Sequence, residues 1–121
     1  MIVKNLLPAI LFVLLTLTAC GKDSVEVKKE IPKDLIIIDV RTKAEYDNGH
    51  LKDALLIPFN VIGDKIAEKV PDKEAHIALY CRSGRRSGIA LNTLKKMGYT
   101  NAENYGGLQS ASKQLSVKIV E

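Results

Sequence analysis

Residues that bind soft metal ions are scarce in this sequence. The 121 residues include two cysteines, Cys20 and Cys81, and two histidines, His50 and His76. Zinc sites combine such ligands in closely spaced pairs, and the chain contains no pair of this kind. The composition therefore argues against a metal centre, and we expect neither a metal nor another cofactor.

Aromatic residues and clustered positive charge are scarce as well. Phe, Trp and Tyr make up 5% of the chain, tryptophan is absent, and 18 lysines and arginines face 14 acidic residues. The lysines are spread along the chain, whereas nucleic-acid-binding proteins gather theirs into a patch or stripe. We therefore expect no nucleic acid partner.

The longest hydrophobic run lies at the amino terminus and is short. Residues 6–19 hold about 14 apolar residues, fewer than the roughly 18 that span a bilayer. Lys4 precedes the run, as in a secretory signal peptide. Its end, Leu17-Thr-Ala-Cys20, resembles the bacterial lipobox, in which the cysteine is acylated after cleavage.

These features predict a lipoprotein signal peptide at residues 1–19, a lipidated Cys20 and a tether at residues 20–33. The lipid would anchor the chain to a membrane of the bacterial cell envelope, facing the periplasm. Ordinary cleavage and an uncleaved anchor are the alternatives. Removal of residues 1–19 leaves 102 residues, which is enough for one small domain.

Strand-like and helix-like segments alternate along the rest of the chain. The continuous apolar runs 35–40 and 76–80 are typical of strands covered on both faces. The expected strands are 35–40, 54–57, 76–80 and 101–105. The expected helices are 42–48 (opened by a capping box of Thr42 and Glu45), 61–70 (capped by Asn60), 87–97 and 108–115. This order predicts an α/β fold in which a mostly parallel sheet of four to five strands carries helices on both faces, within one domain at residues 34–121.

Cys81 stands at the carboxyl end of a predicted central strand, where open α/β sheets bind their ligands. Gly84 allows a tight loop whose backbone N–H groups surround the sulfur, and the helix expected from Ser87 adds a partial positive charge. These donors favour the thiolate, so the pKa of Cys81 should be lower than that of a free cysteine. The alternative is an inert core cysteine beside a solvated arginine face.

Three arginines, Arg82, Arg85 and Arg86, follow Cys81, and the segment holds no acidic residue. Guanidinium groups favour an anionic substrate, either a phosphate ester or a sulfur donor. Tyrosine phosphatases place five residues between the cysteine and the arginine, but here four residues separate Cys81 from Arg86. The shorter loop is better suited to a sulfur atom on the thiolate than to a phosphoryl group.

Three motifs in the same order resemble the rhodanese family of sulfurtransferases. They are Leu35-Ile-Ile-Ile-Asp-Val-Arg41 with Glu45-Tyr46 and 49–58, then Cys81-Arg-Ser-Gly-Arg-Arg-Ser87, then Gly98-Tyr99 with Asn104-Tyr-Gly-Gly-Leu108. The small size and export signal are most similar to single-domain periplasmic rhodaneses. The tryptophan that often follows the Gly-Gly turn in the family is missing here.

The resemblance implies that Cys81 takes the outer sulfur of thiosulfate as a persulfide and passes it to cyanide or a thiol. It also implies that residues 82–87, Arg82, Ser83, Gly84, Arg85, Arg86 and Ser87, bind the donor, with Arg86 pointing into the site. Asp39 and Arg41 would support the loop. A sulfur-relay or thiol-redox partner and a non-catalytic anion-binding lipoprotein are the alternatives.

Overall fold

The structure is a computed structural model that describes residues 29–121. The predicted signal peptide, Cys20 and most of the predicted tether lie outside these residues. A four-stranded sheet in the order β3-β1-β4-β5 forms the centre, and every neighbouring pair in it is parallel. Its strands are β1 (Ile36–Asp39), β3 (Leu55–Leu56), β4 (Ile77–Cys81) and β5 (Ala102–Gly107).

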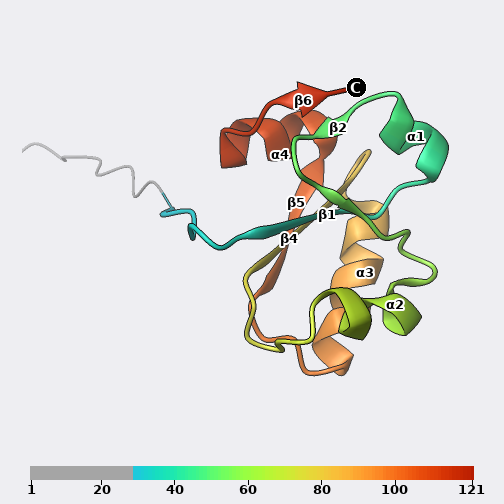
Figure 1. Ribbon diagram of the computed structural model, residues 1–121, viewed down its shortest axis with the longest axis vertical. Helices are drawn as coiled ribbons and strands as arrows, with labels where there is room; N and C mark the ends of the chain where they lie inside the picture. Colours follow the sequence, from blue (N-terminus) through green and yellow to red (C-terminus); the bar gives the residue numbers. More distant parts are fainter. Residues whose placement is uncertain (1–28) are drawn as a thin grey trace, which may run out of the picture.

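Helices cover both faces of this sheet (Figure 1). They are α1 (Lys43–Asp47), α2 (Ile62–Lys69), α3 (Arg85–Lys96) and α4 (Leu108–Leu115). Along β4, Leu79 and Cys81 pack in one hydrophobic cluster with residues of α2 and α3, while Tyr80 packs in a second cluster with residues of α4. This alternation follows from the two-residue period of a strand, and all five residues of β4 are buried. The predicted fold class is confirmed.

Two short strands were not predicted from the sequence. They are β2 (His50–Leu51) and β6 (Ile119–Val120), which pair antiparallel as a separate two-stranded sheet. Two residues are too few for an alternating apolar pattern, so their pairing depends on where the chain is brought by the rest of the fold. In Figure 1, β6 lies beside β2 and α4, above the central sheet.

The ends of two helices differ from the prediction. Helix α3 begins at Arg85, two residues before the expected Ser87, because Gly84 at its N-cap takes a left-handed conformation (φ +98°) that turns the chain directly into the helix. Helix α2 is preceded by Val61 without a side-chain cap, so the prediction that Asn60 caps it was wrong. Thr42, by contrast, caps α1 in a complete capping box with Glu45.

Parallel pairing brings the carboxyl ends of β1, β4 and β5 to the same edge of the sheet. The chain after β1 leads into α1, and the chain after β4 forms the loop of residues 82–84 before α3. The end of β5 pairs with β4 at Gly107 and Cys81. The predicted site residues of β1 and the cysteine loop therefore gather at one edge.

Candidate active site

The Cys81 sulfur lies at the end of β4, directly beneath the start of α3. The residue is fully buried. The backbone N–H of Gly84 donates a hydrogen bond to Sγ at 3.0 Å, and Sγ and the Ser87 hydroxyl oxygen are 3.3 Å apart. The 12 residues of α3 add the partial positive charge of a helix amino terminus near the sulfur.

These contacts make Cys81 more acidic than an ordinary cysteine. Burial raises the pKa of the thiol, but hydrogen bonds from the Ser87 side chain and from the backbone of Ser87, Ser83 and Gly84 outweigh it and lower the pKa to about 7. The sulfur is therefore partly ionised near neutral pH. The cradle of loop donors around the sulfur agrees with the expectation from the sequence.

Two glycines make the loop possible. Gly84 has a positive φ, and a Cβ atom on it would lie 3.3 Å from Gly106 Cα. A Cβ atom on Gly107 would lie 2.3 Å from the Arg82 carbonyl oxygen, which is closer than any side chain tolerates. The backbone at the end of β5 therefore supports the cysteine loop from one side, and only glycine fits at position 107.

The three arginines of the segment have different surroundings. Arg86, in the first turn of α3, forms a bidentate ion pair with Glu45 of α1, with nitrogen–oxygen distances of 2.7 and 2.9 Å. This pair raises the pKa of Arg86 and lowers the pKa of Glu45 to about 2. Arg82 and Arg85 are exposed, and within residues 29–121 neither forms an ion pair.

The lack of an acidic residue in the segment after Cys81 thus gave no sign that Arg86 has a carboxylate partner. Its carboxylate partner comes from a helix about 40 positions earlier in the chain, because parallel pairing places α1 beside the loop after β4. The site still differs from a solvated arginine face, since the Arg86 charge also interacts with the Cys81 sulfur.

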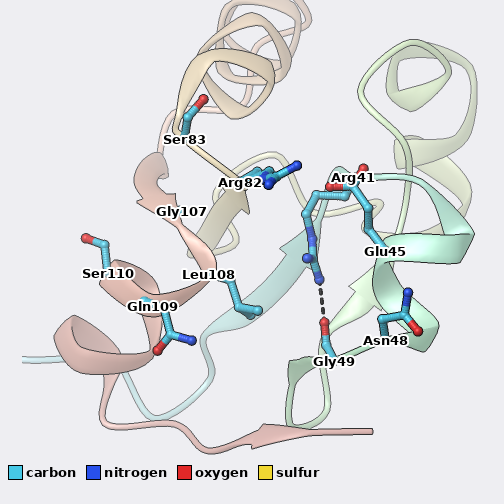
Figure 2. A pocket seen from close by; sticks show the side chains of 10 residues that line it. All are labelled: Arg41, Glu45, Asn48, Gly49, Arg82, Ser83, Gly107, Leu108, Gln109 and Ser110. Atoms are coloured by element: carbon cyan, nitrogen blue, oxygen red, sulfur yellow. Dashed lines mark hydrogen bonds between the residues drawn. The ribbon is translucent and has the colours of Figure 1, made fainter.

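A surface pocket of about 590 Å³ opens beside the loop. Its lining comes from α1 and the residues on either side of it, from the loop, and from the end of β5 with the start of α4: Arg41, Glu45, Asn48, Gly49, Arg82, Ser83, Gly107, Leu108, Gln109 and Ser110. Figure 2 shows Arg82 extending from the loop toward Arg41, with Leu108 turned into the same space. The pocket therefore offers a free cation and an apolar side chain next to the residues that follow Cys81.

Asp39 and Arg41 form a buried pair that supports this edge of the sheet. The Arg41 guanidinium donates to both carboxylate oxygens of Asp39 and to the Gly49 carbonyl, at 2.6–3.1 Å. The Tyr80 hydroxyl donates to Asp39 at 2.8 Å and accepts from the Leu51 N–H. Asp39 thus ties β1 to β4 and to the chain after α1, while Arg41 also lines the pocket.

The two histidines are not brought to the sulfur. The His50 ring stacks on Tyr46 and its Nδ1 lies 2.8 Å from the Tyr46 carbonyl oxygen, as expected for a residue that stabilises a turn. His76 lines a different pocket, with the start of β5. Among residues 29–121 no three side chains of the metal-binding types cluster, and no helix there has the length and apolar character to cross a bilayer.

The comparison with protein families decides what this arrangement is. The model of the rhodanese-like domain matches residues 23–114, which is most of the chain. The chain belongs to the rhodanese-like domain family.

Individual rhodanese relatives agree with this assignment. The thiosulfate sulfurtransferase PspE of Escherichia coli is 44% identical over 72 residues, which cover 60% of this chain and 69% of PspE. A solved structure described as a rhodanese with anions from E. coli is 39% identical with a TM-score of 0.65, over 72% of this chain and 98% of that one.

Longer proteins share the rhodanese-like domain as well. The probable adenylyltransferase/sulfurtransferase MoeZ of Mycobacterium tuberculosis is 37% identical over 91 residues, but this chain spans only 23% of its length. The family and the rhodanese type of enzyme that the sequence indicated are thereby confirmed.

Two positions in this rhodanese-like site were missed by sequence reasoning. Glu45 was noted only as part of a helix cap and of a family motif, and Asn104 only as part of the carboxyl-terminal motif. Both contact the cysteine segment from elements distant in the chain, Glu45 through Arg86 and Asn104 through Ser87 and Gly84. The only available signal was that each belongs to a motif shared with the family.

Proposed function

We propose that this chain is a thiosulfate sulfurtransferase that carries sulfur as a persulfide on Cys81. The observation that carries the proposal is a buried sulfur that accepts a hydrogen bond from the loop and has its pKa lowered to about 7, in a segment that also holds the exposed arginines Arg82 and Arg85. The names of the relatives support the same reaction, because PspE is a thiosulfate sulfurtransferase. A related rhodanese solved with anions supports an anionic donor.

The first half of the reaction loads the enzyme. The Cys81 thiolate attacks the outer sulfur of thiosulfate, a new S–S bond forms, and the original S–S bond breaks with its electron pair leaving on sulfite. The product is a Cys81 persulfide anion. The backbone N–H groups that now surround the thiolate would hold this anion, so no general base is required.

The second half returns the enzyme to its starting state. Cyanide or a thiolate attacks the terminal sulfur of the persulfide, and the S–S bond breaks with its electron pair returning to Cys81. Electrons balance without an external oxidant or reductant. Because the Cys81 residue is fully buried, both reagents reach its sulfur only when part of the surrounding structure moves.

The pocket beside the loop favours an organic thiol as the acceptor. Its volume of about 590 Å³ lies within the roughly 300–1,000 Å³ typical of sites for drug-sized molecules, and cyanide is far smaller. Arg82 would pair with a carboxylate on such a thiol, and Leu108 would contact its carbon chain. Cyanide remains a suitable laboratory acceptor.

Incubation of the purified protein with thiosulfate, followed by intact mass measurement, tests the proposal. We expect a mass gain of one sulfur on Cys81, sulfite release, and thiocyanate formation after cyanide is added. Cys81→Ser should abolish all three. If the wild-type protein gains no sulfur, the proposed sulfurtransferase activity is refuted and a non-catalytic anion-binding lipoprotein is favoured. If it gains sulfur but does not transfer it to small acceptors, a partner in a protein sulfur relay is favoured.

We also propose that the mature chain is a lipoprotein of the bacterial envelope. The support is the sequence of residues 1–20, with its short apolar run and lipobox-like end. Mass spectrometry of the protein from a bacterial host should find an acylated Cys20 at the new amino terminus, and Cys20→Ser should release the domain from membranes. Membrane association that persists in Cys20→Ser would contradict the lipid anchor.

A further inference from the structure

The side-chain amide of Asn104 connects three parts of the candidate site. Its Nδ2 donates to the Gly84 carbonyl oxygen at 2.9 Å, and its Oδ1 accepts from the Gly106 N–H at 2.9 Å. Oδ1 also lies 2.7 Å from the Ser87 hydroxyl oxygen. Asn104 therefore touches the cysteine loop, the first turn of α3 and the glycine turn that ends β5.

The two backbone partners fix which way the amide points. A carbonyl can only accept, so the Gly84 oxygen requires the NH2 group; a backbone N–H can only donate, so Gly106 requires Oδ1. Oδ1 therefore faces Ser87. Because Oδ1 has no hydrogen, the Ser87 hydroxyl must be the donor in that contact.

Ser87 cannot give its single proton to both of its neighbours. Its side chain is fully buried, so no water replaces a missing partner, and its oxygen lies 2.7 Å from Asn104 Oδ1 and 3.3 Å from Cys81 Sγ. In the thiol form Cys81 S–H donates to Ser87, and Ser87 donates to Asn104. When the thiol loses its proton to solvent, the hydroxyl must turn to the sulfur and give up Asn104.

We infer that Asn104 is a positioning residue that acts through Ser87 and competes with the Cys81 sulfur for the Ser87 proton. It holds that proton on the side away from the sulfur and so limits how far the thiolate is stabilised. Any effect of Asn104 on sulfur transfer rests on the proposed function. The competition for the Ser87 proton, by contrast, is a property of the protein without substrate. Asn104 is exposed, so its effect should be moderate.

An irregularity in the sheet places Asn104 at this point. Leu79 of β4 pairs with Asn104, but Cys81 pairs with Gly107, so β5 contains one more residue than β4 over this stretch. Such a bulge bends a strand and redirects its side chains. The extra residue is accommodated at Gly106, whose φ is +80°.

A double-mutant cycle on the pKa of Cys81 tests the inference. The pKa is measured from the pH dependence of alkylation by iodoacetamide and of thiolate absorbance, in wild type, Asn104→Ala, Ser87→Ala and the double variant. Loss of the Nδ2 bond to Gly84 loosens the loop equally whether or not Ser87 is present. The difference between the two Asn104→Ala shifts therefore reports only the competition for the Ser87 proton.

We expect Asn104→Ala to lower the pKa of Cys81 by about 0.5 to 1 unit more when Ser87 is present than when Ser87 is replaced by alanine. A difference of this size corresponds to the contribution of one weak hydrogen bond. Asn104→Asp keeps an acceptor oxygen, and a stronger one, so its coupling with Ser87 should have the opposite sign. Equal shifts in both backgrounds, or couplings of the same sign for the alanine and aspartate variants, would overturn the inference.

Asn101→Ala is the matched control. Asn101 precedes β5, and its Nδ2 donates to a backbone carbonyl, that of Glu74 at 2.8 Å, far from the sulfur. This variant should leave the pKa of Cys81 unchanged. The charged groups on the elements around Cys81 are Asp39, Arg41, Glu45, Arg82, Arg85, Arg86 and Glu103. All of the variants keep these groups, and only Asn104→Asp adds a further charge.

The outcome does not depend on sulfur transfer. Alkylation and thiolate absorbance need no sulfur donor, so a protein that fails to form a persulfide can still show the coupling. Circular dichroism of each variant confirms that the comparison is between folded proteins.

Discussion

Replacing Glu45 with glutamine should increase the reactivity of the enzyme toward thiosulfate. Glu45 neutralises Arg86 through two hydrogen bonds and also lines the pocket beside the loop. With its pKa lowered to about 2, it is ionised throughout the usual assay range. The proposed dianionic donor would therefore meet a carboxylate at the pocket and would compete with it for the Arg86 guanidinium.

The size of the effect follows from the exposure of the pair. Charge-assisted hydrogen bonds contribute about 1.5–3 kcal/mol when well shielded. The Arg86 and Glu45 side chains are 20% and 28% exposed, so solvent reduces this to about 1 kcal/mol. Transferred to the donor, that energy corresponds to a rise in kcat/KM for thiosulfate of about 3- to 10-fold.

The assay is thiocyanate formation at saturating cyanide, in which kcat/KM for thiosulfate reports the first half-reaction. The control is Asp47→Asn, which removes the same charge from the same helix, since Asp47 pairs with exposed Lys43 away from the pocket. The gain in Glu45→Gln should shrink as salt is added. A kcat/KM that falls would refute the reasoning, because it would mean that Glu45 orients Arg86 productively and does not compete with the donor.

Three further predictions concern ionisation and packing. First, the pKa of about 7 predicts that alkylation of Cys81 rises through pH 7 and levels off above about pH 8; a midpoint near that of free cysteine, about 8.5, would contradict the hydrogen-bonded thiolate. Second, the lowered pKa of Glu45 stabilises the fold above its ordinary value of 4.5, and this contribution is lost as the pH falls from about 4.5 to about 2. The difference in urea stability between wild type and Glu45→Gln, about 1 kcal/mol at pH 6, should therefore vanish near pH 2, and a constant difference would contradict the ion pair. Third, Gly107→Ala should destabilise the fold by about 3 kcal/mol, because its Cβ would strike the Arg82 carbonyl, whereas Gly98→Ala, with open space around it and φ +95°, should cost about 1 kcal/mol in thermal unfolding; equal losses would contradict the close approach.

Much of the fold could be predicted because its signals are local. The apolar runs of β1 and β4 and the Thr42 capping box depend on residues a few positions apart, and each was found where expected. The pair β2 and β6 could not be predicted, because its pairing joins residues about 70 positions apart. The start of α3 was misplaced because a left-handed glycine can either end a loop or begin a helix.

The same distinction applies to the site. The cysteine and the loop donors are consecutive in the sequence, so the hydrogen bonds to the sulfur could be predicted from the residue types and their spacing. Glu45 and Asn104 reach the segment across parallel strands, and a sequence gives no direct measure of such contacts. The expectation that all three arginines bind the donor stays a prediction, and for Arg86 the donor would have to compete with the Glu45 carboxylate.

The charge around the loop can now be balanced against that of the proposed donor. Four arginines lie at this edge of the sheet, and two of them are neutralised, Arg41 by Asp39 and Arg86 by Glu45. Among residues 29–121, Arg82 and Arg85 keep their charges unpaired, and together they would match the two negative charges of the proposed donor, thiosulfate. A third free guanidinium would favour the dianion more strongly, but it would also favour retention of sulfite after the S–S bond breaks. In the proposed reaction the Glu45 carboxylate would oppose both donor binding and product retention, so Glu45→Gln should raise kcat/KM for thiosulfate while making sulfite a stronger inhibitor.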